Sequence, residues 1–486
     1  AYRSLRKSVL DYDRRHGYRG AETYVDMANV TAGQDEALEE LLSDFSDNDD
    51  LLPALVLEAT PQRVNAYLRG GEVLNIQADG LKFAAPMLSD KAPPNKRLRR
   101  GAIIRVQKTD KGWQILQLPE VQSAFVAASP IDGAIRALVG GFDFSRSKFN
   151  HVTQAWRQPG SSFKPFIYSA AMEKGYTPAS VIPDEPISIS ADETGSQAWE
   201  PRNYDGKYEG PMTLRTALAK SKNMVSIRLL RAIGPRYAQD YITRFGFDAE
   251  KHPPYLTMAL GAGSVTPWQQ LVAYSVFANG GYRIEPYIVR QILDDKGNVL
   301  AATRPVIAGD ESLRVIDARN AWLVDSMLHD VVRRGTATRA QVLKRGDLAG
   351  KTGTTNDYVD AWFCGYQPTV VGIAWIGFDA PRRMGSGETG GSAALPIWIG
   401  YMEQALKGVP ESWPDTPEGL ITITANDPSS GKAGKDMVYQ ESLPPAPEEA
   451  PASAVQQPPA PVVDAKPKAV EKTAPQNPAM PGEKRN

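Results

Sequence analysis

Three short motifs in a fixed order constrain this chain of 486 residues more than any other feature. They are Ser161-Ser162-Phe163-Lys164, Ser221-Lys222-Asn223 and Lys351-Thr352-Gly353-Thr354. An ordered set of S-x-x-K, S-x-N and K-T-G is the signature of a serine acyltransferase that uses lysine, in place of histidine, as its proton acceptor. The order carries the signal, because S-x-x-K alone also begins at Ser4, Ser145 and Ser429.

The surroundings of Ser161 favour it over the other serines. Ser161 follows Pro159-Gly160 and precedes an apolar run with helical spacing, which predicts a buried helix that Ser161 opens. Lys164 lies three residues further on, so its amine is expected on the same helical face, within reach of the hydroxyl. An ordinary helix-capping serine is the alternative interpretation.

The second motif is expected on a connection between two helices. The apolar pattern predicts one helix over residues 213–219 and another over 225–233. Ser221, Lys222 and Asn223 fall between them, where a loop is able to face a cleft.

The third motif reads as a strand, because residues 358–363 and 370–378 follow it as two further strands. A phosphate-binding loop is excluded, since that pattern requires glycine where this chain has Arg345. Alternation puts Thr352 and Thr354 on one face of the strand, and their hydroxyls with a nearby ammonium suit a carboxylate. Gly353 is expected to let a substrate backbone approach closely. A plain turn is the other interpretation.

These motifs, with their order and surroundings, resemble the transpeptidase domain of class A penicillin-binding proteins, most closely the 1a type of Gram-negative bacteria. The likeness covers residues ~1 to ~410. It includes the stretches Trp156–Gly160, Leu260-Gly261, Val265–Pro267, Phe277–Gly281, Arg334–Ala337 and Asp360–Phe363.

An α+β multidomain fold is expected. Short alternating runs between residues 54 and 118, separated by turns, predict five strands and a small OB-like β-barrel. After about residue 120, a strand hairpin, helices and later strands predict an antiparallel sheet flanked by helices, as in serine β-lactamases and transpeptidases. The expected limits are 1–50 for a linker, 51–119 for the barrel, 120–410 for the transpeptidase domain, 411–443 for a C-terminal extension in which order fades, and 444–486 for a tail.

The resemblance implies a mechanism and assigns its residues. Ser161 is the nucleophile, Lys164 its base, and Ser221 and Lys351 complete the catalytic set. Asn223, Thr352, Gly353 and Thr354 are expected to bind the substrate. The implied activity is D,D-transpeptidase crosslinking of peptidoglycan stem peptides through a serine acyl-enzyme, which β-lactam antibiotics inhibit.

Two other functions stay open. The same serine would serve a D,D-carboxypeptidase or a serine β-lactamase, although no E-x-x-x-N arrangement typical of class A β-lactamases lies between Asn223 and Lys351. A non-catalytic β-lactam sensor or scaffold would keep the fold for binding alone.

The net charge of −1 argues against nucleic acid as a partner, despite the basic cluster of residues 96–100. We expect that cluster, in the OB-like domain, to meet a regulatory protein or an anionic surface. The four histidines show no ligand spacing, so no metal or other cofactor is expected.

The sequence contains no apolar run of 18 residues, so no spanning helix is expected. The resemblance implies a periplasmic enzyme that an upstream segment anchors to the inner membrane, with a glycosyltransferase domain also upstream. Residues 444–486 contain 11 prolines and few aromatic residues, a composition typical of a disordered tail.

Overall fold

The first sheet is built from the alternating apolar residues of the N-terminal third. The computed structural model describes residues 1–28, 30, 35–194 and 197–442. The sheet is antiparallel, its order is β1-β5-β2-β3-β4, and β6 pairs with β5. Its strands are β1 (Thr23–Tyr24), β2 (Leu52–Ala59), β3 (Arg63–Leu68), β4 (Val73–Gln77), β5 (Ala102–Thr109) and β6 (Gly112–Leu116).

All five strands expected from the alternating runs are confirmed, and β1 was missed. Two residues are too few to show alternation. β1 is held in place because Thr23 pairs with Ile103, which lies 80 residues further along the chain. The inward side chains, among them Val56, Val64 and Ile104, form a core of their own.

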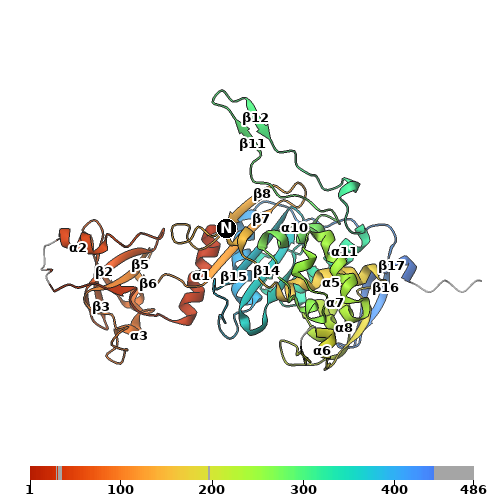
Figure 1. The fold of residues 1–486 in the computed structure, drawn as a ribbon, viewed down its shortest axis with the longest axis horizontal. Helices are drawn as coiled ribbons and strands as arrows, with labels where there is room; N and C mark the ends of the chain where they lie inside the picture. Colours follow the sequence, from red (N-terminus) through yellow and green to blue (C-terminus); the bar gives the residue numbers. More distant parts are fainter. Residues whose placement is uncertain (29, 31–34, 195–196, 443–486) are drawn as a thin grey trace, which may run out of the picture. The chain divides into compact units, whose positions relative to one another are not determined.

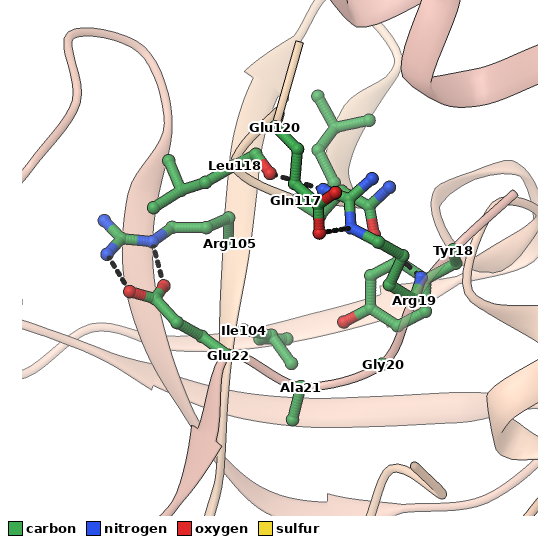
Figure 2. Close-up of a pocket in the computed structure, with 11 residues that line it drawn as sticks. Tyr18, Arg19, Gly20, Ala21, Glu22, Ile104, Arg105, Gln117, Leu118 and Glu120 are labelled. Atoms are coloured by element: carbon green, nitrogen blue, oxygen red, sulfur yellow. Dashed lines mark hydrogen bonds and ion pairs between the residues drawn. The ribbon is translucent and has the colours of Figure 1, made fainter. Parts of the chain in front are cut away.

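A cavity of about 280 Å³ lies beside this sheet, and Figure 2 shows that its charged groups are paired with one another. Arg105 donates to both carboxylate oxygens of Glu22, at 2.7 and 3.0 Å. Arg19 pairs with Glu120 at 3.4 Å and also donates to the Leu118 carbonyl. The cavity contains no residue of the three motifs, and its internal pairing indicates a structural junction.

A second sheet, of five strands, forms the centre of the larger part of the molecule. Its order is β13-β14-β15-β7-β8 and every pair is antiparallel. Strands distant in the sequence thus lie side by side, since β7 pairs with β15. The strands are β7 (Gln122–Ala128), β8 (Ile135–Val139), β13 (Ala349–Thr354), β14 (Asp360–Gln367) and β15 (Val370–Gly377).

Helices cover both faces of this sheet (Figure 1). Tyr366 of β14 donates to Asp325 of α11, whereas Phe363, three residues earlier on the same strand, packs edge-to-face on Trp398 of α12. Even and odd residues of a strand point to opposite faces, so α11 and α12 lie on opposite sides. The expected antiparallel sheet flanked by helices is confirmed.

The remaining elements are short pairs of strands and the helices. The pairs are β9 (Val181–Asp184) with β10 (Gly210–Thr213), β11 (Gln291–Leu293) with β12 (Val299–Ala302), and β16 (Leu420–Asp427) with β17 (Lys432–Tyr439). The α-helices are α1 (Tyr2–His16), α2 (Asp35–Leu42), α3 (Ala85–Leu88), α4 (His151–Gln154), α5 (Lys164–Glu173), α6 (Ala191–Thr194), α7 (Leu214–Ala219), α8 (Asn223–Ile233), α9 (Pro235–Ile242), α10 (Pro267–Ala278), α11 (Ala318–Arg334) and α12 (Leu395–Ala405).

The expected loss of order after Pro410 is wrong for residues 420–439, which form β16 and β17. Arg215 of α7 forms a two-bond pair with Asp436 of β17, at 2.6 and 2.9 Å. Thr216 donates to Asp427 at 2.5 Å. These pairs join the C-terminal hairpin to α7. Sequence periodicity does not reveal such contacts between distant segments.

Residues 1–50 contain α1, β1 and α2, and the buried residues Leu5 and Val9 of α1 belong to the same core as the second sheet. The expected domain limits stay predictions. The tail expected at 444–486 lies outside the described residues. Among the helices of the described part, none is long and apolar enough to cross a membrane.

Candidate active site

Ser161 lies in a tight turn that glycines allow to sit close against β13. The turn is a 3₁₀ helix, Gly160–Phe163, and α5 begins at Lys164, so Ser161 opens a turn in front of the expected helix. Gly160 has φ of +55°, and a Cβ there would stand 2.6 Å from the Thr354 carbonyl oxygen. A Cβ on Gly261 would stand 2.2 Å from the Gly160 oxygen. Only glycine permits both approaches.

Buried hydrogen bonds hold this turn in place. Tyr274 donates to the Ser162 carbonyl at 2.6 Å and Gln270 donates to the Ser162 hydroxyl at 3.1 Å. The indole of Trp362 donates to the carbonyl of Gln158 at 2.8 Å. Ser161 itself is only partly buried, and within the described residues its hydroxyl has no hydrogen bond. The turn therefore presents a fixed serine with an unengaged hydroxyl.

Lys164 is fully buried and its ammonium meets the second motif. Nζ donates to the Ser221 carbonyl at 2.6 Å, to the Asn223 side-chain oxygen at 2.7 Å and to the Ser221 hydroxyl at 3.3 Å. Burial, together with the positive charge of Lys351, holds the pKa of Lys164 well below its ordinary value. The expected hydrogen bond from Lys164 to Ser161 is not formed in this state, because the amine is directed at Ser221 and Asn223.

Ser221 lies between two lysines. Its hydroxyl oxygen accepts from Lys351 Nζ at 2.8 Å as well as from Lys164. Ser221 has φ of +59°, a left-handed conformation that costs a residue other than glycine of order 1–3 kcal/mol and clusters at functional sites. With its lone pairs facing ammonium groups, the Ser221 hydroxyl keeps its own proton for donation.

The second motif is anchored by residues that the sequence did not indicate. Lys222 is 2% exposed and pairs with Glu209 at 2.9 Å, Asp205 at 3.1 Å and Asp184 at 3.4 Å. Asn203 accepts from the backbone N–H of Asn223 at 2.8 Å. No spacing rule links these positions to the motif, so the sequence carried no signal for them. Asn223 is the first residue of α8, which corrects its expected place on a connection.

Lys351 is fully buried in β13, and burial lowers its pKa to about 7. Its neighbours on the strand are held through their hydroxyls. Thr352 shares a hydrogen bond of 2.6 Å with Thr336, and Thr354 accepts from the Gly390 N–H at 3.0 Å. The strand thus brings one ammonium and two fixed hydroxyls to the serine turn.

Gly353 has a structural reason for being glycine, beside the expected approach of a substrate, which stays a prediction. A Cβ there would stand 2.5 Å from the Pro159 carbonyl oxygen and 3.0 Å from Ser162 Cβ. The missing side chain therefore lets β13 pack against the serine turn.

An aromatic pair bridges two further segments. Tyr204 is 63% exposed, its hydroxyl donates to the Tyr358 hydroxyl at 3.0 Å, and the two rings meet edge-to-face. Tyr204 follows Asn203, which caps the Asn223 segment, and Tyr358 follows β13 by four residues. The bridge joins the segment that contacts the second motif through Asn203 to the segment that follows the third motif. In the described part of the chain, no three His, Cys, Asp or Glu side chains are arranged to hold a metal ion.

Family models match both sheets. Residues 123–377 match the penicillin binding protein transpeptidase domain, and residues 18–121 match the penicillin-binding protein OB-like domain. The fold and the three converging motifs therefore define a penicillin-binding transpeptidase domain that follows an OB-like domain.

Comparison with individual proteins shows which penicillin-binding proteins this chain resembles. Penicillin-binding protein 1A of Neisseria lactamica is 46% identical over 87% of this chain and 53% of its own length. The corresponding values for penicillin-binding protein 1A of Pseudomonas aeruginosa are 39%, 93% and 61%. The crystal structure of penicillin-binding protein 1A from Haemophilus influenzae superposes with a TM-score of 0.83 at 34% identity, over 91% of this chain and 70% of that one.

The chain belongs to the penicillin-binding protein 1A family, whose role is peptidoglycan biosynthesis. It spans about half the length of the first of these curated relatives.

Proposed function

We propose that this chain is a D,D-transpeptidase that crosslinks peptidoglycan stem peptides through an acyl-enzyme on Ser161. One observation supports the proposal most directly. The Ser221 hydroxyl lies 3.3 Å from the ammonium of Lys164 and 2.8 Å from that of Lys351, beside a serine turn whose own hydroxyl is unengaged. Two buried lysines with lowered pKa values are poised for proton transfer.

In the acylation step, neutral Lys164 takes the proton of Ser161 as the serine oxygen attacks the carbonyl carbon between two D-alanines. The backbone N–H groups of Ser161 and Thr354 stabilise the resulting oxyanion. The peptide C–N bond breaks, an ester forms on Ser161, and Ser221 passes its proton to the departing amine while it takes the proton held by Lys164. The terminal D-alanine leaves as a free amino acid.

In the transfer step, an amine of a neighbouring stem peptide attacks the ester carbonyl. A new peptide bond forms as the amine loses a proton to Lys164, and Lys164 passes that proton to the Ser161 oxygen as the ester bond breaks. Asn223 holds the donor peptide through its side-chain amide, and Thr352 and Thr354 bind its terminal carboxylate with the charge of Lys351. Gly353 lets β13 pack against the serine turn, which keeps Lys351, Thr352 and Thr354 beside Ser161.

A β-lactam takes the place of the donor. Its strained amide acylates Ser161 in the same way, and the adduct is hydrolysed slowly. The rival hydrolase functions, a D,D-carboxypeptidase or a β-lactamase, differ only in using water as the acceptor. The rival sensor function predicts an adduct with penicillin but no product from a donor peptide.

The test is to incubate the chain with a labelled penicillin and locate the adduct by intact mass and peptide mapping, with Ser161→Ala alongside. A stable adduct on Ser161 that is absent from the variant supports the proposal. Rapid release of hydrolysed penicillin points to a β-lactamase, and an adduct elsewhere contradicts the assignment of Ser161. Crosslinked product from stem peptides then separates the transpeptidase from the carboxypeptidase and from the sensor.

We further propose a periplasmic location at the inner membrane, where peptidoglycan is assembled. Regulatory proteins would bind at the basic cluster of the OB-like domain. There Leu98 is 2% exposed and anchors the loop, while Lys96, Arg99 and Arg100 are exposed.

A further inference from the structure

The hairpin of β11 and β12 is the most apolar exposed segment of the described chain. Seven of the 19 large apolar side chains that are exposed lie between residues 288 and 307, so exposed apolar side chains are concentrated in this segment. They are Ile288, Val289, Ile292, Leu293, Val299, Leu300 and Ile307. In Figure 1 the hairpin projects away from the helices and the five-stranded sheet. All residues of both strands are exposed, and a two-stranded hairpin without a covering layer is marginally stable in water.

The two outer edges of this hairpin differ. Ile292 pairs with Ala301 and Leu293 pairs with Val299, which leaves Leu300 as an extra residue on β12. A bulge of this kind twists and blunts an edge against further strands. The β11 edge has no such defect and is open to another strand.

The direction of the backbone groups on β11 follows from its hydrogen bonds to β12. The Thr303 N–H donates to the Arg290 carbonyl, and the Asp294 N–H donates to the Asn298 carbonyl, both at 2.9 Å. In an antiparallel pair the residues that bond to the partner strand alternate with residues whose N–H and C=O point away. Gln291 and Leu293 therefore direct their backbone groups outward from the β11 edge.

The stretch Arg290–Asp294, which contains β11, is complementary to itself in one antiparallel register. The Asp294 carboxylate, which also accepts from Lys296 and Asn298 in the hairpin turn, is partly exposed. If Ile292 meets Ile292 of a second copy, Gln291 stands opposite Leu293, the pair whose outward backbone groups would exchange hydrogen bonds. In the same register Arg290 stands opposite Asp294, once on each side of the centre. Residues directly opposite lie on the same face and interact, so two ion pairs would flank an apolar pair.

We propose that this hairpin joins two copies of the chain, through antiparallel pairing of their β11 edges centred on Ile292. The contact gives a continuous four-stranded sheet with two-fold symmetry, a self-complementary interface of the kind that forms closed dimers. It goes beyond the proposed catalytic function, because it places two serine sites in one assembly without contributing a residue to either.

The contact is small, so the dimer should be weak. Two short hairpins bury less than the ~1,200 Å² typical of the smallest stable interfaces. Association should therefore depend on concentration, and added salt should weaken it by screening the exposed pairs of Arg290 and Asp294.

Cysteine crosslinking tests the register. Directly opposed residues at a pair without hydrogen bonds have Cα atoms about 4.5 Å apart, within the range of a disulfide. Ile292→Cys should form a disulfide-linked dimer under mild oxidation. Leu300→Cys, on the bulged strand and at least as exposed (66% against 52%), is the matched control and should crosslink at least about tenfold more slowly at the same concentration. The native Cys364 is fully buried and does not compete.

Charge reversal tests the complementarity without a new bond. Arg290→Glu would oppose Asp294 of the second copy and should weaken association at least about tenfold in sedimentation velocity at low salt. Arg304→Glu makes the same charge change beyond the end of β12 and should leave association unchanged. Acylation by labelled penicillin should be normal in all four variants, because the hairpin holds no residue of the serine site.

The proposal is overturned if the chain stays monomeric at high concentration, or if Leu300→Cys crosslinks as fast as Ile292→Cys. Equal association of the Arg290→Glu and Arg304→Glu variants would also overturn it. Failure of these experiments would leave the transpeptidase proposal untouched, since that proposal rests on the Ser161 adduct.

Discussion

At the scale of single residues, the site depends on what burial does to two lysines. Lys164 and Lys351 are both 0% exposed, and both have pKa values below the ordinary value. An amine that is neutral near physiological pH can take a proton from a serine, which a solvated ammonium cannot do. The hydroxyl of Ser221 connects the two and offers a route for the proton.

Replacing Lys164 tests its role as the base. Lys164→Arg keeps a cation that cannot lose its proton, so acylation by penicillin should fall by about 10²- to 10⁴-fold, the usual contribution of a general base. The second-order rate constant for adduct formation is the measurement. Lys174→Arg, an exposed residue one position beyond the end of α5, should stay within about twofold of the unmodified chain. Near-normal acylation of the Lys164 variant would exclude it as the base.

The pH profile of acylation should be bell-shaped. The rate should rise with pH as Lys164 becomes neutral, and should fall as Lys351 loses its charge above pH about 7, because a neutral amine no longer attracts the carboxylate of the substrate. Lys351→Arg, which stays charged, should remove the falling limb even if the rate is lower throughout. Thermal unfolding of the variant checks that it is folded. A falling limb that persists in the folded variant would assign it to another group.

At the scale of elements, the site is a contact between a turn and a strand. The 3₁₀ turn Gly160–Phe163 meets β13 so closely that Gly160 and Gly353 have no room for a Cβ. Because β13 is an edge strand of the five-stranded sheet, its free side is available to the turn and to an extended substrate.

Gly160→Ala should both destabilise the fold and slow acylation. A positive φ costs roughly 1–2 kcal/mol for alanine and the overlap with the Thr354 carbonyl adds about 1–3 kcal/mol. Gly246→Ala is the matched control, since Gly246 also has a positive φ, of +91°, but its Cβ would make an ordinary contact at 3.6 Å. The control should show only the first cost in thermal unfolding and normal acylation. Equal effects of the two substitutions would mean that the close packing of the turn is unimportant.

At the scale of the whole molecule, residues 1–442 form one compact unit that contains all three motifs. The C-terminal hairpin of β16 and β17 belongs to this unit through Arg215 and Asp436. The polar pairs it makes with α7, the helix just before Ser221, tie it to the part of the chain that carries the second motif.

A chain that ends after Ser442 should therefore fold and react normally. Acylation by penicillin and the midpoint of thermal unfolding should match those of the full chain, since no motif residue lies beyond 442. A chain that ends after Pro410 instead removes Asp436 and leaves Arg215, whose side chain is only 16% exposed, without its two-bond partner. Breaking a buried pair in this way costs about 3–5 kcal/mol. Similar stability of the two truncated chains would contradict a structural role for the hairpin.

Local patterns determined much of this protein. Five strands of the first sheet follow from alternation over five to eight residues, and the helices α5, α7 and α8 from apolar spacing, because such periods are properties of neighbouring residues. The order of the three motifs pointed to the family because it, too, can be read directly from the sequence. Strands too short to alternate, such as β1, could not be predicted from a local pattern.

Only the tertiary structure decided which groups meet. The sequence did not tell that Lys164 turns toward Ser221 and Asn223, that Lys222 is held by three carboxylates, or that Gly353 makes room for the serine turn. These contacts join positions 13 to 194 residues apart, so no local period encodes them. The lowered pKa values depend on the packing as well, because desolvation is set by every atom that closes around a side chain. Local sequence determined the motifs and most of the elements around them, and packing determined the chemistry between them.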